Sequence, residues 1–192
     1  MINYISIVNY HLSIRKMVSE QKTHIKKGLI IALVLILVDI VLQVTHQKFQ
    51  PWVNYLNIAI LLIGVVASVN IKATEPNEKA IFSNLFGYGF KVSVVTVCVM
   101  FVYTFLSIYV VFPNYLNEFY EHQMAEAQKL PNFNAAGIAM AENKAMALKV
   151  MRTSLLSMVI MFNLAVGITG ALVGSVIALL IESFNQKKVS QK

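Results

Sequence analysis

Charge is scarce in this sequence: only 13% of its 192 residues are Asp, Glu, Lys or Arg, and only nine are acidic. Hydrophobic residues make up 57%, and the mean hydropathy is +0.65. A soluble domain carries more charge than this, because its surface must be hydrated. The composition therefore favours an integral membrane protein without a separate soluble domain.

Reactive side chains are equally scarce. The single cysteine, Cys98, lies within an apolar run, which excludes an intrachain disulfide and a cysteine metal cluster. The apolar runs and their flanks also lack the acidic pairs or histidine–acid sets that an enzyme would need. We therefore expect a protein that is not an enzyme, with no catalytic, cofactor-binding or metal-binding residues.

The sequence does have four apolar runs, and a bilayer core of about 30 Å needs about 20 helical residues to cross. The runs are continuous, whereas the strands of a membrane barrel alternate apolar and polar residues, so helices are expected. We predict an all-α fold, an integral membrane four-helix bundle, with spans at about 28–45, 52–71, 88–112 and 153–181. They belong to one membrane domain, 28–185, between a cytoplasmic amino-terminal segment, 1–27, and a basic cytoplasmic tail, 186–192.

Lysines and arginines are distributed unevenly around the spans. Eleven of the sixteen fall in the amino-terminal segment, around the connection between spans two and three, and in the tail; the other five are Lys48, Lys129, Lys144, Lys149 and Arg152. Because basic residues collect on the cytoplasmic side, we expect both termini there. These residues flank spans and form no patch with aromatics, so their expected partner is the lipid bilayer and not nucleic acid.

The longest segment outside the spans, 113–152, is predicted to form an extracytoplasmic helical hairpin. Tyr115, Phe119 and His122 recur at helical spacing, Pro131 marks a break, and a second stripe continues into span four. Proline disrupts a helix interior, so we expect a kink at Pro113. On the same side, we interpret His46 and Lys48 as a solvated turn. The aromatic residues there indicate an interfacial belt: Trp52, Tyr55, Tyr109, Phe112 and Tyr115.

Small residues decide where membrane helices approach each other, because lipid does not reward the burial of apolar side chains between helices. Each span carries one face of small or polar residues at helical spacing. Spans two and four supply the helix-packing residues that we predict: Gly64, Ser68, Gly167, Gly170 and Gly174.

The polar members of these faces fall at similar depths, counted from the outer end of each span. Their offsets differ by roughly 7 Å at most on the helical rise, which helix tilt can absorb. We predict one intramembrane polar cluster, built on Asp39, Asn57, Tyr103 or Ser107, and Asn163.

Asp39 has two interpretations, because an ionisable residue inside a span costs roughly 2.5 to 3.5 kcal/mol and is a functional candidate by default. In the first, it is a proton-carrying or ion-binding carboxylate in a transport path. In the second, it is a hydrogen-bonded, protonated acid that holds the four helices in register. We favour the second, since transporters usually show several ionisable groups and broken helices, and neither is visible here.

Three stretches carry a resemblance to a known family. They are the basic start of span one, Lys26, Lys27 and Gly28 followed by LIIALVLIL; the first part of span three, FGYGFKVSV from Phe86; and its exit, YVVFPNYLNEFYEHQMAEAQ from Tyr109. In these the chain resembles the small four-span bacterial membrane proteins grouped as domain of unknown function 4199, over most of its length. The resemblance implies the topology with the hairpin and a bacterial inner membrane location, and it implies no activity.

The chain departs from this family at its start, where sixteen residues precede Met17. Residues 1–16 form an amphipathic interfacial helix, or translation begins at Met17. As for function, we expect an accessory or scaffolding subunit that meets a membrane protein partner, or a second copy of itself, through its glycine-lined helices and its hairpin. The alternative is a small proton- or ion-coupled transporter using Asp39.

Overall fold

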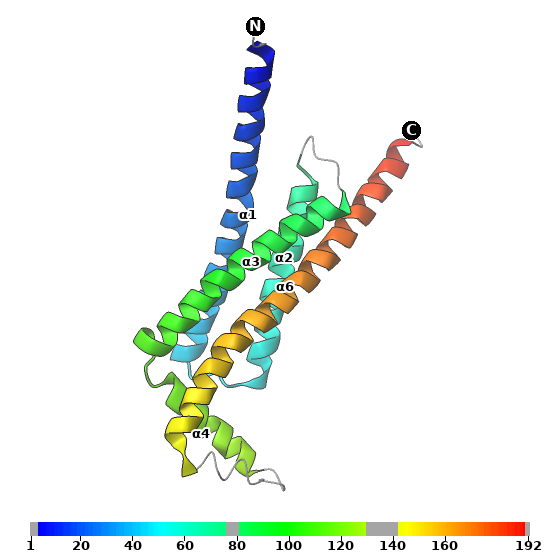
Figure 1. Ribbon diagram of the computed structural model, residues 1–192. Coiled ribbons are helices and arrows are strands. Elements are labelled where there is room, and N and C mark those ends of the chain that lie inside the picture. The colour runs from blue at the N-terminus through cyan, green and yellow to red at the C-terminus, as the bar shows by residue number, and fades with distance from the viewer. Residues whose placement is uncertain (1–3, 76–80, 130–141, 191–192) are drawn as a thin grey trace.

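The computed structural model describes residues 4–75, 81–129 and 142–190, with side chains described for 23–75, 81–129 and 142–184. Every element in these ranges is helical: α1 Tyr4–Val44, α2 Pro51–Ala73, α3 Phe82–Leu106, the π-helix η1 Ser107–Val111, α4 Tyr115–Gln128 and α6 Lys144–Ser190 (Figure 1). Four segments are long and apolar enough to cross a membrane: Thr23–Val44, Pro51–Ala73, Phe82–Val111 and Lys144–Phe184. Within the described residues, the all-helical class and the four membrane-length helices are thus confirmed, and the first, third and fourth begin earlier than predicted.

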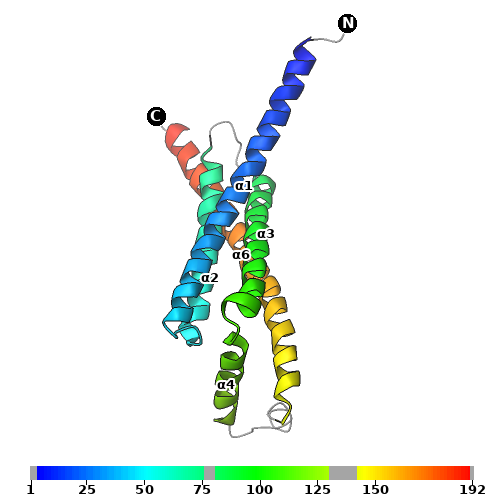
Figure 2. The ribbon, with the colours of Figure 1, turned by 90° about the vertical axis from the view of Figure 1, so that its left-hand side faces the viewer.

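The helices form a bundle with α3 and α2 at its centre. α3 packs against α1, α2 and α6, and α2 packs against α1 and α6, so α1 and α6 occupy opposite corners. Both ends of the chain lie at one end of the bundle, which we call the terminal end (Figures 1 and 2). The α1–α2 loop (residues 45–50) and α4 lie at the opposite end, which we call the α4 end. Two helices are longer than the predicted spans. At the α4 end, α6 begins at Lys144, and at the terminal end, α1 extends beyond the bundle and runs without a break from Tyr4.

Prolines mark where two of these helices begin and end. Pro51 occupies the first turn of α2, where its fixed φ is favourable and its missing N–H costs nothing. At the end of α3 the hydrogen bonds widen, and the Phe112 N–H donates to the Ser107 carbonyl at 2.8 Å, the spacing of a π-helix. Pro113 has no N–H to continue the ladder. The chain therefore leaves the helix at Phe112 and restarts as α4 at Tyr115, where the kink was expected.

The terminal half of the bundle is packed through small residues. A Cβ atom placed on Gly167 would lie 2.5 Å from Ser93 Cβ, and one on Gly28 would lie 2.7 Å from Val95 Cβ, so only glycine permits these approaches. Thr96 Oγ1 adds a hydrogen bond across the second contact, to the Gly28 carbonyl at 3.1 Å.

The other predicted packing residues also lie between helices. Gly64 lies against Ile31, Gly170 against Val65, and Gly174 against the backbone of Val66. Ser68 is buried, and its hydroxyl donates to the Gly64 carbonyl of its own helix at 2.7 Å. Gly89, which we did not single out, lies at the contact of α3 with both α2 and α6.

Candidate functional site

The α1–α2 loop reverses the chain directly after α1. The Gln47 N–H donates to the Leu42 carbonyl at 2.9 Å, and the His46 N–H donates to the Gln43 carbonyl at 3.2 Å. These are the two bonds of a Schellman motif, which needs a left-handed residue at its turn. His46 takes that conformation, with φ of 56°. The reversal returns the next residues, including Lys48, over the last turns of α1.

Lys48 pairs there with the acid of span one. Its Nζ lies 2.9 Å from Asp39 Oδ2, and the Tyr103 hydroxyl of α3 donates to the same oxygen at 2.8 Å. The Lys48 and Asp39 side chains are only 17% and 13% exposed. His46 is exposed in its turn, as predicted, but Lys48 beside it is paired and largely buried, so the solvated-turn interpretation is wrong for Lys48. Asp39 thus has a cationic partner within the protein, from the loop that follows its own helix.

Asp39 and its neighbours line a cavity of about 190 Å³ between α1, α2, α3 and α6. All the side chains that we predicted as a polar cluster line this cavity: Asp39, Asn57, Tyr103, Ser107 and Asn163. Hydrogen bonds join only part of the set. Tyr103 donates to Asp39, whereas Asn163 Nδ2 donates to the Val159 carbonyl of its own helix at 2.8 Å.

Several polar atoms of the cavity have no partner within the described part of the chain. Asp39 accepts both of its hydrogen bonds at Oδ2, which leaves Oδ1 free, and the Asn54 and Asn57 amides make no hydrogen bond. An unpaired polar group is unfavourable in an apolar environment. These atoms are therefore positioned to bind water or a polar ligand.

An aromatic cluster, Phe49, Tyr115, Phe119 and His122, fixes α4 to the α1–α2 loop. The Phe49 ring stacks on Tyr115 and on His122, with centroids 5.8 Å and 5.2 Å away, and it also contacts Phe119. Lys48 Nζ lies 4.3 Å from the centre of the Tyr115 ring, a cation–π contact. Burial, and secondly the negative charge of Asp39, raise the pKa of Tyr115. The phenol therefore stays neutral beside the ion pair.

The same end of the bundle includes a contact between α4 and the start of α6. Lys144 Nζ lies 2.6 Å from Glu121 Oε1 and 5.1 Å from the centre of the Tyr120 ring. The predicted break at Pro131 and the first part of the second stripe lie outside the described residues, and the end of that stripe, from Lys144, is helical in α6. The hairpin over 113–152 therefore stays a prediction.

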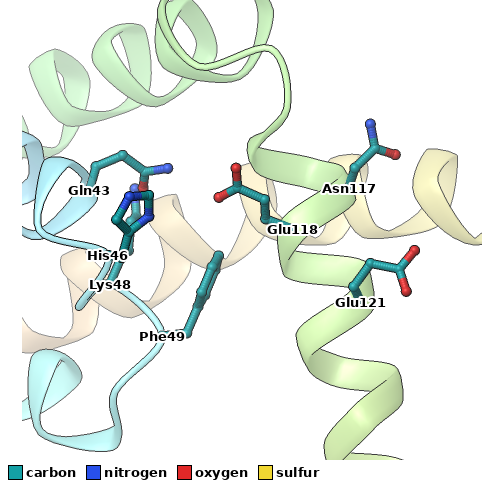
Figure 3. Close-up of a pocket in the computed structure, with 7 residues that line it drawn as sticks. All are labelled: Gln43, His46, Lys48, Phe49, Asn117, Glu118 and Glu121. Carbon is teal, nitrogen blue, oxygen red and sulfur yellow. The ribbon is translucent and has the colours of Figure 1, made fainter.

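A second pocket, of about 450 Å³, lies between the α1–α2 loop and α4. Figure 3 shows Glu118 pointing from α4 toward Gln43 and His46, whereas Asn117 and Glu121 point away from them. Across the ranges with described side chains, no three His, Cys, Asp or Glu residues gather as metal ligands would. We assign no metal to this pocket.

The sequence reasoning missed Lys48, Phe49 and Tyr115 as site residues. A signal for Lys48 was present, because it is the only lysine or arginine in the loop and follows Asp39 by nine positions. A carboxylate inside a membrane is stabilised by a nearby cation. Phe49 and Tyr115 carried no comparable signal, since their contact depends on how α4 turns after Pro113.

Comparison with known proteins gives a family for the chain. A family model described as "Protein of unknown function (DUF4199)" matches residues 26–183, which reach into all four membrane-length helices and include the whole Asp39 cavity. No curated protein and no solved structure matches the chain. The family match covers well over half of the sequence and agrees with the resemblance seen in its motifs. The chain therefore belongs to the DUF4199 family of proteins of unknown function.

Proposed function

We propose that this protein is a non-enzymatic accessory or scaffolding subunit of a membrane complex, and that the α4 end is its partner-binding surface. The observation that carries the proposal is that segments distant in sequence are fastened together there. The Lys48–Asp39 pair holds the loop to α1, the Phe49 cluster holds the loop to α4, and the Glu121–Lys144 pair joins α4 to α6. A surface fixed in this way loses little conformational entropy when it binds.

The polar residues of the terminal half support the same proposal. Ser93, Thr96 and Ser175 are completely buried. Their hydroxyls donate to backbone carbonyls, at Gly89, Val92 and Ala171 respectively. Ser93 and Ser175 thus bond within their own helices, and Thr96 Oγ1 also lies 3.1 Å from the Gly28 carbonyl of α1, so these polar groups are used in helix packing. Close packing in the terminal half of the bundle, together with a fixed surface at the α4 end, is what we expect of a structural subunit.

For location, we propose the cytoplasmic membrane of a bacterium, with both termini in the cytoplasm. The two chain ends lie at the same end of the bundle (Figure 1). Eleven of the sixteen lysines and arginines belong to the segments assigned to that side. Basic residues beside spans stay in the cytoplasm. The α4 end then lies on the extracytoplasmic side of the membrane, where it can contact the extracytoplasmic part of a partner.

The test is purification of the full chain from native membranes in mild detergent. We expect a partner, or a second copy, in stoichiometric amount. Asn117→Arg places a charge on the exposed face of α4 and should remove that partner. Ser183→Arg makes the same change on exposed surface at the terminal end and should leave the complex intact. A monomer, or a complex that Asn117→Arg retains, contradicts the proposal.

A second candidate, a proton- or ion-coupled transporter, is favoured by one observation, namely that Asp39 lines a cavity and its Oδ1 has no partner among the residues whose side chains are described. The test is flux into proteoliposomes that contain the purified protein. Asp39→Asn should abolish a coupled flux while the melting temperature shows that the variant is folded. A wild-type protein that carries no proton or solute flux rejects this candidate.

A further inference from the structure

A groove of about 480 Å³ runs between α2 and α6 beside the Asp39 cavity. The residues that line both spaces are Asn54, Asn57, Leu155, Val159 and Asn163. The groove and the cavity therefore adjoin, with amide side chains at the boundary. One space is largely apolar and open at the surface of the bundle, and the other contains the ion pair.

The groove follows from the distribution of small and large residues along two helices. In the terminal half, Gly170 and Gly174 let α6 approach α2 closely. Toward the α4 end the groove is lined by larger side chains, Tyr55, Met158 and Phe162, which are exposed at the bundle surface. A groove opens between the two helices there, within segments long and apolar enough to cross a membrane, where the surrounding molecules would be lipids.

We propose that the groove and the cavity together bind a phospholipid with a phosphoethanolamine head group. The acyl chain would lie in the groove against Leu155, Met158 and Val159, and the head group would enter the cavity. This inference goes beyond the accessory role and does not depend on it. It rests on how the charges of the cavity match those of the head group.

The cavity contains one acidic and one basic side chain, Asp39 and Lys48, and each can make further hydrogen bonds. Asp39 Oδ1 has no partner among the described residues, so it can accept a hydrogen bond from a primary ammonium. Lys48 has three N–H donors and uses one on Asp39, so it can also donate to a phosphate oxygen. The free Asn57 amide at the boundary can donate to the phosphate or to the ester oxygens.

Other lipid classes fit this charge pattern less well. A phosphocholine head group has no N–H to donate to Asp39, and a phosphoglycerol head group adds a negative charge without an ammonium to balance the carboxylate. Diacylglycerol has no charge and would leave both groups unmatched. Water is the remaining occupant, since 190 Å³ is roughly six water volumes at about 30 Å³ each.

The experiment uses the full chain in nanodiscs of phosphatidylcholine with a small fraction of lipid carrying a photoreactive acyl chain. Four probes are compared: phosphatidylethanolamine, phosphatidylcholine, phosphatidylglycerol and diacylglycerol. After irradiation, mass spectrometry maps the labelled peptides. We expect phosphatidylethanolamine to label the groove segment 155–163 about tenfold more than the other probes, the preference expected from one charge-assisted hydrogen bond.

Variants separate the site from the general lipid surface. Asp39→Asn should remove the preference for phosphatidylethanolamine. Asn57→Leu, which blocks the boundary but leaves the ion pair in place, should weaken labelling even if Asp39→Asn does not fold. Glu126→Gln makes the same charge change on exposed α4 and should have no effect. Equal labelling by all four probes, stronger labelling by phosphatidylglycerol, or labelling that Asn57→Leu leaves unchanged would overturn the proposal.

Discussion

At the scale of single residues, Lys48 supplies the cationic partner of Asp39. Within the spans alone, Asp39 would be an unpaired ionisable residue, which is energetically costly. The loop lysine gives it a cation 2.9 Å away, and Tyr103 adds a hydrogen bond from α3. The pair is nearly buried, so each charge depends on the other much more than in a surface ion pair.

The first prediction concerns this dependence. Lys48→Gln leaves Asp39 without its cation and should lower the free energy of unfolding by about 2 kcal/mol, less than for a fully buried pair because both groups keep some exposure. Asp39→Asn combined with Lys48→Gln should recover much of the loss, since no unpaired charge remains. Thermal unfolding of the purified chain in detergent measures both. Lys129→Gln, in an exposed pair with Glu126, is the control and should not change the midpoint.

His46 gives a second prediction, of the opposite sign. A residue with a Cβ atom is strained at φ of 56°, and glycine is not. His46 is exposed, so little packing is lost with its ring. His46→Gly should therefore raise the free energy of unfolding by about 1 kcal/mol. Gln47→Gly, one position later, should give no gain. A loss of stability in His46→Gly would mean that its side chain makes a contact that outweighs the strain.

At the scale of elements, the ends of the helices position the side chains of the cavity, and glycines allow the close helix contacts that hold those helices in place. The Schellman turn after α1 returns Lys48 to Asp39, and the π-helix η1 carries Ser107 and Ile108 to the cavity wall. π-helical turns are often found at functional positions, because the extra residue redirects side chains. Farther along, close contacts of α6 with α3 and α2 fix the helices that carry the cavity.

The third prediction tests these contacts with two glycines in matched variants. Gly167→Ala places a methyl group 2.5 Å from Ser93 Cβ, so α3 and α6 must separate, and the free energy of unfolding should fall by about 1 to 3 kcal/mol. Gly87→Ala is the control, because a Cβ there meets nothing within 4 Å. It should leave stability unchanged or slightly higher, since alanine is the better helix former. Equal losses in the two variants would contradict the packing argument.

At the scale of the whole molecule, four membrane-length helices return the chain to the side on which it began. The two termini share one end and the fastened surface occupies the other (Figure 2). The large apolar side chains exposed along the helices, such as Ile63, Met161 and Val110, then face acyl chains. Large apolar residues thus occupy both the core, as Leu35 and Leu61 do, and the outer surface, while the buried serines and threonine lie between the helices.

The fourth prediction tests this orientation in intact bacterial cells. In a Cys98→Ser background, Lys129→Cys at the α4 end should react with an impermeant maleimide added outside. Ser183→Cys, at the terminal end, should react only after the membrane is opened. Gel shifts of the labelled protein measure both reactions. Labelling of both positions from one side would contradict a membrane crossing by α6, which lies between them, and the reversed pattern would contradict the charge-based orientation.

Much of the arrangement could be predicted because membrane helices leave strong patterns. The four runs, the small faces with Gly64, Gly167, Gly170 and Gly174, and the shared depth of Asp39, Asn57 and Asn163 can all be derived from residue spacing. Lys48, the only lysine or arginine of its loop, was a signal for a partner of Asp39, but the contact itself could not be placed, because the length of a loop does not say which way it turns. Gly89 was missed for a similar reason: its role depends on α2 and α6 meeting α3 at the same level.

The sequence by itself determined that the chain is four apolar helices with one small or polar face each, because a bilayer requires internal hydrogen bonding and continuous apolar length. Only the tertiary structure decided which side chains complete the cavity. Those contacts join loop, α3 and α4 residues that are far apart along the chain, and they depend on a left-handed turn at His46 and on where α3 ends before Pro113. The spacing of residues along one helix does not predict such contacts, because they depend on the path that each connecting segment takes between the packed helices.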